Sequence, residues 1–255
     1  MQFAILGSGS RGNATLIQSD QTCLMVDCGF SIRETCRRLE MLDTGPETID
    51  GILVTHEHSD HIRGVGPFAK RYSIPVWASN GTAMLLQDKD VEVNRINVHE
   101  TFEIDEMKVY PVPVPHDARE PCQFVIEAKG KRLGILTDVG SVTSHITQTY
   151  KDCDALMLEF NHDIDMLENS SYPFNVKKRI AGNLGHLNNE QSCALLQELL
   201  PGQLRHIVAA HLSESNNRAS HVRELMETRI NGVDCAFDVA SQDNVSGWYS
   251  MDQSC

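Results

Sequence analysis

Short, continuous apolar runs alternate along the chain with polar loops and with longer segments of helical periodicity. The run GILVTH at 51–56 is apolar without alternation, which is typical of a strand covered on both faces. The runs at 3–7 and 14–18 flank the glycine- and serine-rich loop GSGSRGN, which predicts a hairpin. At 31–42 the period lengthens to that of a helix, with Ser31 as a candidate N-cap.

The same pattern assigns the remaining elements. It predicts strands at 3–7, 14–18, 22–27, 51–56, 74–78, 107–113, 122–128, 132–137, 154–159, 206–210 and 233–239. It predicts helices at 31–42, 62–72, 80–87, 143–150, 190–200 and 216–230.

The order of these elements indicates the fold class. No linker rich in Pro, Gly or Ser divides the chain, and no short-period repeat is visible. Each half consists of strands followed by strand–loop–helix units, so the two halves of the chain show a weak internal similarity. We therefore expect an α/β (α+β) fold in which two mixed β-sheets pack face to face with helices outside, and a single domain over residues 1–255.

Composition is that of an ordinary globular protein: 255 residues are enough for one large core, and no stretch approaches the roughly 18 apolar residues of a membrane span. The N-terminus has neither a basic region nor a long apolar region of the signal-peptide kind, so we expect a cytoplasmic location. The eight cysteines form no CxxC pair and mostly lie in apolar stretches. They are interpreted as buried free thiols.

The formal net charge of −13 argues against a non-specific polyanion binder, because phosphate contacts require Lys and Arg. It does not exclude a nuclease. Two bound divalent cations would offset about four negative charges, and local basic segments can outweigh the global balance. Such segments lie near Arg37, Lys70 and Lys177, although any of them is more simply a solvated face.

The central chemical signal is the motif His56-x-His58-x-Asp60-His61, directly after the strand at 51–56. Imidazole and carboxylate are the usual ligands of Zn, Mn and Fe in proteins. Alternate residues of an extended loop point the same way, so His56 and His58 can hold one ion while Asp60 and His61 turn toward a second. A solvent-exposed polar loop rarely has this pattern.

One loop cannot complete two metal shells, so further ligands must come from other strand ends. Three candidates have the same local form, an apolar strand that ends in a ligand: His116, Asp138 and His211. Each alone is more simply a residue at the edge of the core. Together with the motif at 56–61 they favour a metal site, in which the carboxylate of Asp138 is able to bridge two ions.

This order of motifs resembles the metallo-β-lactamase superfamily, and the early GSGSRGN and VDCG segments match it as well, over nearly the whole chain. The resemblance implies a four-layer αββα sandwich. It also implies the following roles: His56, His58 and His116 bind one divalent ion, Asp60, His61 and His211 bind the other, Asp138 bridges both, and Asp27 supports the ligand loop by hydrogen bonds. Zn and Mn both suit such a site.

The segments LEFNHD, YPFNVKKRIAGNLGH and HLSESNN resemble the YycJ/WalJ-type subfamily, with Asn188 where serine is expected. That resemblance implies 5′-to-3′ exonuclease activity on DNA. Related RNase Z and phosphoribosyl cyclic phosphodiesterase branches imply that His186 approaches the scissile phosphate and assists the leaving oxygen. The expected mechanism is attack by a hydroxide shared between the two ions opposite Asp138, with Asp60 also in the catalytic set.

Other residues have weaker assignments. Asn161 and His162 follow the strand that ends in Glu159, and they are candidates to line the cleft; His162 is surplus as a ligand. The loop GSGSRGN, which contains Ser8, has backbone N–H groups that can cradle a phosphate, but glycine-rich turns are common.

Two alternatives to a DNA nuclease stay open. A small-molecule hydrolase, either a cyclic phosphodiesterase or a glyoxalase II-type thioesterase, suits the acidic composition and the compact length. A binding protein on a degenerate hydrolase scaffold is disfavoured by the intact ligand set. Only 72 residues separate Asp138 from His211, too few for a β-CASP insertion, although a tRNA-processing type of arm has room within 162–184.

Overall fold

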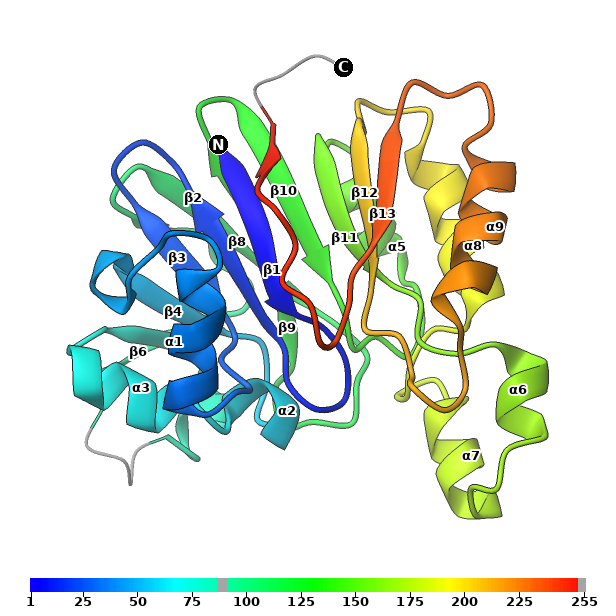
Figure 1. The fold of residues 1–255 in the computed structure, drawn as a ribbon, viewed down its shortest axis with the longest axis horizontal. Helices are drawn as coiled ribbons and strands as arrows, with labels where there is room; N and C mark the ends of the chain where they lie inside the picture. The colour runs from blue at the N-terminus through cyan, green and yellow to red at the C-terminus, as the bar shows by residue number, and fades with distance from the viewer. Residues whose placement is uncertain (87–90, 252–255) are drawn as a thin grey trace.

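The computed structural model describes residues 1–86 and 91–251; the last residue of the helix predicted at 80–87, and Cys255, lie outside these ranges. Two seven-stranded mixed sheets face each other (Figure 1). The first has the order β14 (Tyr249–Ser250), β1 (Gln2–Gly7), β2 (Ala14–Gln18), β3 (Cys23–Val26), β4 (Gly51–Val54), β5 (Val76–Ser79), β6 (Val93–Ile96). The second has the order β13 (Ala236–Val239), β12 (His206–Ala210), β11 (Ala155–Glu159), β10 (Lys131–Leu136), β9 (Cys122–Ala128), β8 (Met107–Pro113), β7 (Phe102–Ile104).

Helices cover the outer faces of both sheets. Helices α1 (Ile32–Glu40) and α3 (Val65–Tyr72) lie outside the first sheet, and α5 (Ser144–Tyr150), α8 (Asn189–Leu199) and α9 (Ala219–Arg229) lie outside the second (Figure 1). The single turns α2 (Ser59–Ile62) and α4 (Asn80–Ala83) follow β4 and β5. Helices α6 (Ile164–Glu168) and α7 (Phe174–Ile180) project beyond the edge of the second sheet (Figure 1).

Side-chain alternation along the strands builds three apolar layers. In β4, Leu53 packs into the cluster between the sheets, while Ile52 and Val54 point to the cluster under α1 and α3. In β11, Met157 lies between the sheets and Leu158 in the cluster under the helices of the second sheet. Three apolar layers separate four structural layers, which confirms the predicted αββα sandwich.

The topology gathers strand ends at one edge. Strands β3 to β6 are parallel to one another, and so are β10 to β13. Carboxyl ends of parallel strands meet at the same edge, and in open α/β sheets that edge is where ligands bind. The loops after β3, β4, β8, β10, β11 and β12 all lie there (Figure 1).

The helix predicted at 62–72 is wrong at its start. The chain forms α2 and then α3, and the break falls at Gly64, whose N–H donates to the carbonyl of Cys28. A Cβ at Gly64 would lie 1.9 Å from the carbonyl oxygen of Phe30, so the close approach of the two segments requires glycine. The helix at 80–87 is a single turn, and the one at 216–230 begins at Ala219.

Several short elements escaped the hydrophobic pattern. The edge strand β6 has the sequence VNRI and is only partly buried, β7 has three residues, and β14 has two. Helices α6 and α7 are five and seven residues long, too short for a helical period to emerge. Tertiary contacts rather than local pattern define these pieces.

The cysteines agree with the interpretation as free thiols. The seven cysteines within the described residues form no disulfide with one another, and five of them are buried. Burial raises the pKa of the Cys28 thiol to about 12, so this group stays protonated and unreactive. Within residues 1–86 and 91–251, none of the helices has the length and apolar character that crossing a membrane requires.

Candidate metal centre

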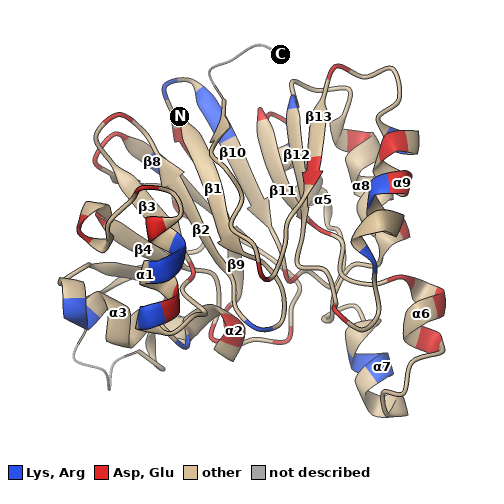
Figure 2. Ribbon diagram, viewed as in Figure 1, with Lys and Arg blue, Asp and Glu red and all other residues tan. Residues whose placement is uncertain are grey.

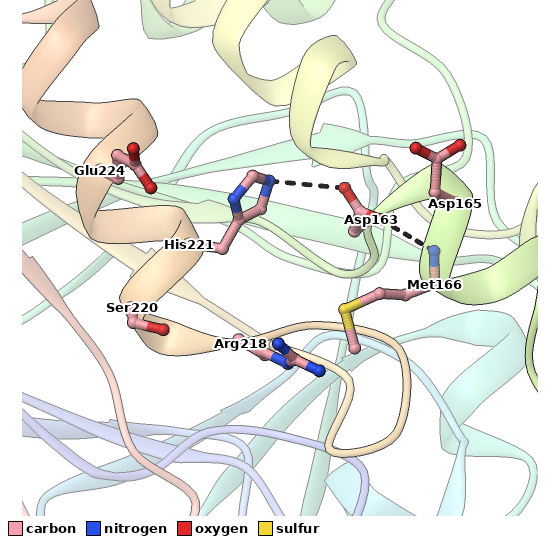
Figure 3. Close-up of a pocket in the computed structure, with 7 residues that line it drawn as sticks. All are labelled: Asp163, Asp165, Met166, Arg218, Ser220, His221 and Glu224. Carbon is pink, nitrogen blue, oxygen red and sulfur yellow. Dashed lines mark hydrogen bonds and ion pairs between the residues drawn. The ribbon is translucent and has the colours of Figure 1, made fainter.

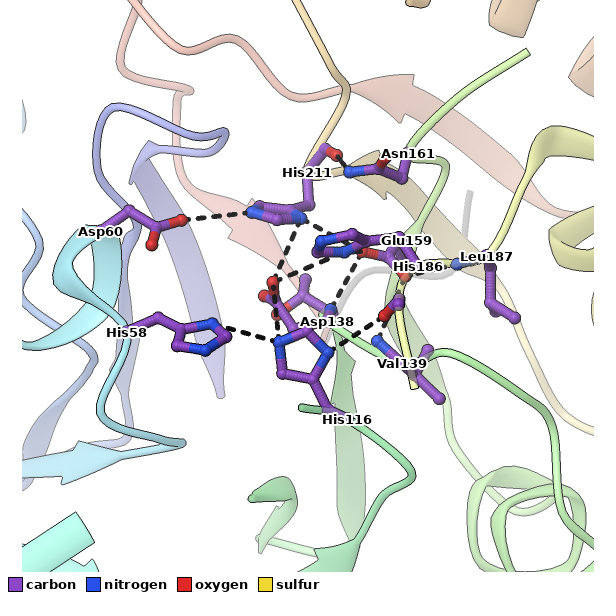
Figure 4. Close-up of polar contacts among 12 residues, drawn as sticks. His58, Asp60, His116, Asp138, Val139, Glu159, Asn161, His186, Leu187 and His211 are labelled. Carbon is purple, nitrogen blue, oxygen red and sulfur yellow. Dashed lines mark hydrogen bonds and ion pairs between the residues drawn. The ribbon is translucent and has the colours of Figure 1, made fainter. Parts of the chain in front are cut away.

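All seven side chains that the sequence nominates as ligands converge at this edge of the sheets. They are His56, His58, Asp60 and His61 after β4, His116 after β8, Asp138 after β10 and His211 after β12. Figure 4 shows His58, Asp60, His116, Asp138 and His211. They fall into overlapping groups, and within each group the possible ligand atoms lie within 4.8 Å of one another. Positions far apart in sequence therefore form one cluster of imidazoles and carboxylates.

The first group consists of His56, His58 and His116. Nδ1 of His116 lies 3.0 Å from the carbonyl oxygen of Gly185, to which it donates, so the ring presents Nε2 to the cluster. That Nε2 lies 3.2 Å from Nδ1 of His58, whose own Nε2 faces the Asp117 carbonyl at 3.2 Å. Backbone carbonyls thus select the nitrogen that each ring offers.

The second group consists of Asp60, His61 and His211. Oδ2 of Asp60 lies 3.4 Å from Nε2 of His61 and 3.5 Å from Nε2 of His211. Asp138 lies between the two groups: its Oδ2 is 3.1 Å from Nε2 of His61, and its Oδ1 is 3.9 Å from Nε2 of His116. A carboxylate in this position can reach an ion in either group.

Three buried polar atoms of the cluster make no hydrogen bond of acceptable geometry among the described residues: Nε2 of His56, Oδ2 of Asp138 and Nε2 of His211. The latter two have ionic neighbours, His61 at 3.1 Å and Asp60 at 3.5 Å respectively. An unsatisfied buried polar group costs about 1–3 kcal/mol, and such groups are rare in folded proteins. Each of these atoms is a lone-pair donor when its group is deprotonated. The donor set therefore fits divalent cations of the Zn or Mn type.

The electrostatics of the cluster favour positive charge. Burial, and then the neighbouring His61, lower the pKa of His56 well below its usual value. Burial alone would also lower the pKa of His61 and His211, but Asp138 and other carboxylates raise the pKa of His61 well above its usual value and that of His211 to about 10. Protonated His61 and His211 balance the buried carboxylates, and a divalent cation would displace those protons.

Asp27, which follows β3, holds the ligand loop. Its carboxylate accepts hydrogen bonds from the backbone N–H and the hydroxyl of Thr55, both at 2.9 Å. It also lies 2.8 Å from Nδ1 of His61, so Nδ1 donates and Nε2 turns toward Asp60 and Asp138. Asp27 adopts φ of 59°, a left-handed conformation that Asp tolerates better than most residues.

Glu159 is a functional residue that sequence reasoning noted only as a strand end. It is fully buried, and its carboxylate accepts five N–H groups: the backbone of Asp138, Val139 and Leu187, and Nδ1 of His186 and His211 (Figure 4). Burial alone would raise its pKa, but the charge and hydrogen bonds of the histidines hold the pKa at about 2. Glu159 therefore fixes the position of Asp138 and the ring orientation of both histidines.

Glu159 also lies within 4.8 Å of Asp138, His186 and His211 as a possible ligand. Its oxygens, however, are already occupied by five N–H donors. We therefore interpret this four-residue group as the support of the cluster rather than as a third ligand set.

Ser8 and Asn161 hold the backbone of His211. The N–H of His211 donates to the Ser8 hydroxyl at 2.9 Å, and its carbonyl accepts from the Asn161 amide at 3.1 Å. His211 has φ of 54°, and a non-glycine residue in this region persists only where its surroundings determine it. Both residues are buried, and their bonds to the His211 backbone give both a positioning role beside the cluster.

Most backbone N–H groups of the glycine-rich loop are already bonded within the protein, so they are not available to cradle a phosphate. The N–H groups of Ser8, Gly9, Arg11, Gly12 and Asn13 all donate to acceptors within the protein. Instead, the Asn13 amide lies 3.3 Å from Oδ2 of Asp60 and 3.1 Å from Nε2 of His61. Asn13 thus supports the second group. This role could not be predicted from the sequence, because asparagine is common in loops of this kind.

His162 does not join the cluster. It is buried, its Nδ1 lies 3.3 Å from the Asn161 side-chain oxygen, and burial lowers its pKa to about 4. It belongs to none of the groups of potential ligands among the described residues. The interpretation of His162 as a surplus loop histidine is the one that fits.

A cavity of about 290 Å³ opens above the cluster. It is lined by Ser10, His58, Ser59, Asp60, Asp138, Arg179, His186 and His211. Nδ1 of His186 lies 2.9 Å from Oε1 of Glu159, so the ring's other nitrogen is the one left for a bound molecule. Arg179, which the sequence marked only as part of a basic segment, contributes a cation to this wall.

Replacing Glu159 by glutamine is expected to weaken metal binding by roughly 10–100-fold, the usual cost of losing a supporting contact. The Glu159 carboxylate accepts from five N–H donors and donates to none. The NH₂ group of a glutamine at this position would therefore face some of these donors without an acceptor. Metal affinity measured by competition with a chelator tests this. The exposed Glu198→Gln on α8 is the control, and equal affinity in both variants would contradict the assigned role.

Known proteins similar to this chain share its fold and length. Residues 22–211 match a family described as a beta-lactamase superfamily domain. The exodeoxyribonuclease YycJ of Bacillus anthracis is 32% identical over 95% of this chain and 96% of its own length, and the exodeoxyribonuclease WalJ of Streptococcus pneumoniae is 33% identical over 85% and 83%. The metallo-β-lactamase fold protein YhfI of Bacillus subtilis superposes with a TM-score of 0.74 at 14% identity, over 96% of this chain and 98% of that one.

Proposed function

The chain belongs to the beta-lactamase superfamily and, within it, to the YycJ/WalJ family of metallo-β-lactamase-fold hydrolases, and from this premise we propose that it is a dinuclear metal-dependent phosphodiesterase that degrades DNA from the 5′ end. The observation that carries the proposal is the pair of ligand groups with Asp138 between them. Two relatives that align with this chain over most of their length are named exodeoxyribonucleases, which supports DNA as the substrate.

In this proposal His56, His58 and His116 would hold one divalent ion, and Asp60, His61 and His211 would hold the other. Asp138, which lies between the two groups, could contribute to both. The three unsatisfied atoms, one on each of His56, Asp138 and His211, support the assignment, because a cation is the partner that would satisfy them together. Zn and Mn both suit an imidazole and carboxylate set.

Two such ions would supply Lewis acidity and would activate water for attack on phosphorus. The chain's own residues do the rest. Glu159 accepts the backbone N–H groups of Asp138 and Val139. It therefore holds the backbone that positions the Asp138 carboxylate before the reaction begins. Asp60, held by Asn13, orients the second group next to the cavity.

His186 is the proposed acid. Burial alone would lower its pKa, but Glu159 raises the pKa above the usual value, which favours the protonated ring. With Nδ1 bonded to Glu159, the remaining nitrogen faces the cavity and can donate that proton to the leaving oxygen.

A small-molecule hydrolase is the second candidate function. The cavity of about 290 Å³ is at the small end of ligand sites, and the net charge of −13 does not attract long polyanions. A cyclic phosphodiester would use the same clusters of ligands and the same acid as a DNA strand.

A substrate panel separates the two functions. The purified protein with added Mn²⁺ or Zn²⁺ is incubated with 5′- and 3′-labelled single- and double-stranded DNA, RNA, bis-p-nitrophenyl phosphate and S-lactoylglutathione. Release of nucleotides from the 5′ end of DNA is the expected result. Cleavage of only the small diester or only the thioester would transfer the assignment to the second candidate.

Chelation tests the metal requirement. Treatment with EDTA is expected to abolish hydrolysis, and added Mn²⁺ or Zn²⁺ is expected to restore it, with EDTA already saturated with metal as the control. Because bound ions stabilise only the folded state, the midpoint of thermal unfolding should fall on chelation and recover with the metal. Full activity in excess EDTA would contradict a metal-dependent reaction.

A further inference from the structure

Helix α7 belongs to a segment whose charge is opposite to that of the whole chain. The protein has a net charge of −13, yet residues 169–189 contain no Asp or Glu and include Lys177, Lys178 and Arg179. Figure 2 shows basic residues on α7 and acidic residues on the neighbouring α6. The nucleic-acid substrate proposed above would find its complementary charge here.

The basic end of α7 is anchored at the metal centre. Nε of Arg179 donates to the Asp117 carboxylate at 2.5 Å, and Oδ1 of that carboxylate lies 3.6 Å from Nε2 of His116. Arg179 lines the cavity together with Asp60 and His186, while its side chain remains 64% exposed. A strand that enters the cavity therefore passes the guanidinium, which can bind a phosphate in bidentate fashion.

The other end of α7 presents an unusual aromatic ring. Phe174 is 81% exposed, the largest exposure of any large hydrophobic side chain that the structure describes. Lys178 follows it by four residues, so both side chains lie on the same face of the helix. An exposed aromatic ring beside a cation is the arrangement by which proteins stack an unpaired base and hold its phosphate.

A second cavity shows where a strand would not pass. It has a volume of about 470 Å³, and its lining includes Asp163, Asp165 and Glu224 with Arg218 as the one Lys or Arg (Figure 3). Three carboxylates against one guanidinium repel phosphates. Because residues of α6 line this acidic cavity while the basic residues lie on α7, the basic face of α7 is the favourable approach to the metal centre.

We propose that α7 guides a single DNA strand into the metal centre: Phe174 stacks on an unpaired base, Lys178 contacts a phosphate on the same face, and Arg179 binds a phosphate at the cavity. The inference rests on the proposed DNA hydrolysis. It goes further by assigning a strand-binding surface outside the cavity and by specifying an unpaired strand, since bases within a duplex have both faces covered by neighbouring base pairs.

The test uses the metal-loaded protein and compares single-stranded DNA with bis-p-nitrophenyl phosphate, a small diester that can bind within the cavity, which Phe174 does not line. Phe174→Ala is expected to raise KM for single-stranded DNA by at least about fivefold, the lower end of what one stacked base contributes. Lys178→Ala is expected to reduce the slope of log(kcat/KM) against log salt concentration by about 0.7, which corresponds to one phosphate contact on a single strand. Neither variant should alter hydrolysis of the small diester.

Val233→Ala and Lys151→Ala are matched controls, because both residues are exposed and lie before parallel strands at the opposite edge of the sheets. Unchanged DNA kinetics in Phe174→Ala and Lys178→Ala would overturn the inference while leaving the proposed function intact. A change in oligomeric state with unchanged DNA kinetics would also overturn it and assign Phe174 to self-association. If the wild-type protein does not cleave DNA at all, the proposed function fails first.

Discussion

Replacing Asp138 by alanine is expected to abolish hydrolysis of DNA and of bis-p-nitrophenyl phosphate alike, and to remove bound metal. The carboxylate lies between the two ligand groups, 3.1 Å from His61 and 3.9 Å from His116, so its loss affects both ions. The fall in activity should exceed the roughly 10–100-fold that loss of a supporting contact costs. Metal content by mass spectrometry and kcat/KM on both substrates measure it.

Asp152→Ala is the matched control for Asp138→Ala, because it removes an exposed carboxylate that precedes β11 at the opposite edge of the sheet. Asp138→Asn keeps the shape and removes the charge, and it should retain more metal than alanine does. If Asp138→Ala binds two ions per chain and hydrolyses DNA at the wild-type rate, the two-ion site proposed here is wrong.

The strands could be predicted because burial on both faces leaves a direct trace in sequence. Run 51–56 is apolar at every position of β4, since Leu53 faces the other sheet while Ile52 and Val54 face helices. The edge strand β6 leaves no such trace, because only its last residue is buried. Single helical turns such as α4 cannot be predicted from the sequence pattern either, because hydrophobic periodicity is detectable only over several turns.

The nominated ligands could be found because imidazoles and carboxylates after apolar strands are rare and share one local form. Glu159 has that form too, yet its carboxylate is occupied by three backbone N–H groups and by Nδ1 of His186 and His211, so it supports the ligands instead of serving as one. Sequence cannot distinguish the two roles, because they depend on how the loop after β10 packs against β11. The same limit hid Asn13 and the anchoring of Arg179 by Asp117.

The acidic composition does not by itself decide between the two candidate substrates. A net charge averages over the whole surface, whereas an approaching strand meets only the charges near the cavity. Those include Arg179 at the wall and Lys178 on α7, next to a buried cluster whose carboxylates would be offset by cations. Local charge of this kind is consistent with both a nuclease and an overall pI of about 5.2.

Replacing His186 by alanine is expected to lower kcat for DNA by roughly 10²–10⁴-fold, the usual contribution of a general acid. Metal content should stay near normal, because Nδ1 of His186 is bonded to Glu159 and the ring belongs to neither of the proposed ligand trios. The reaction of bis-p-nitrophenyl phosphate should be far less affected, since p-nitrophenolate leaves without a proton. Steady-state kinetics on both substrates, with metal analysis of the same samples, give the comparison.

His99→Ala is the control for His186→Ala, because it removes an exposed imidazole from the loop between β6 and β7. His186 also lies within 4.8 Å of ligand atoms on Asp138 and His211, so a competing role as a metal ligand makes a different prediction. Under that role the variant would lose metal, and the small diester and DNA would slow together. If His186 is a proton donor, its loss slows DNA, whose leaving oxygen needs a proton, far more than the small diester. Loss of a metal ligand would not distinguish the two leaving groups.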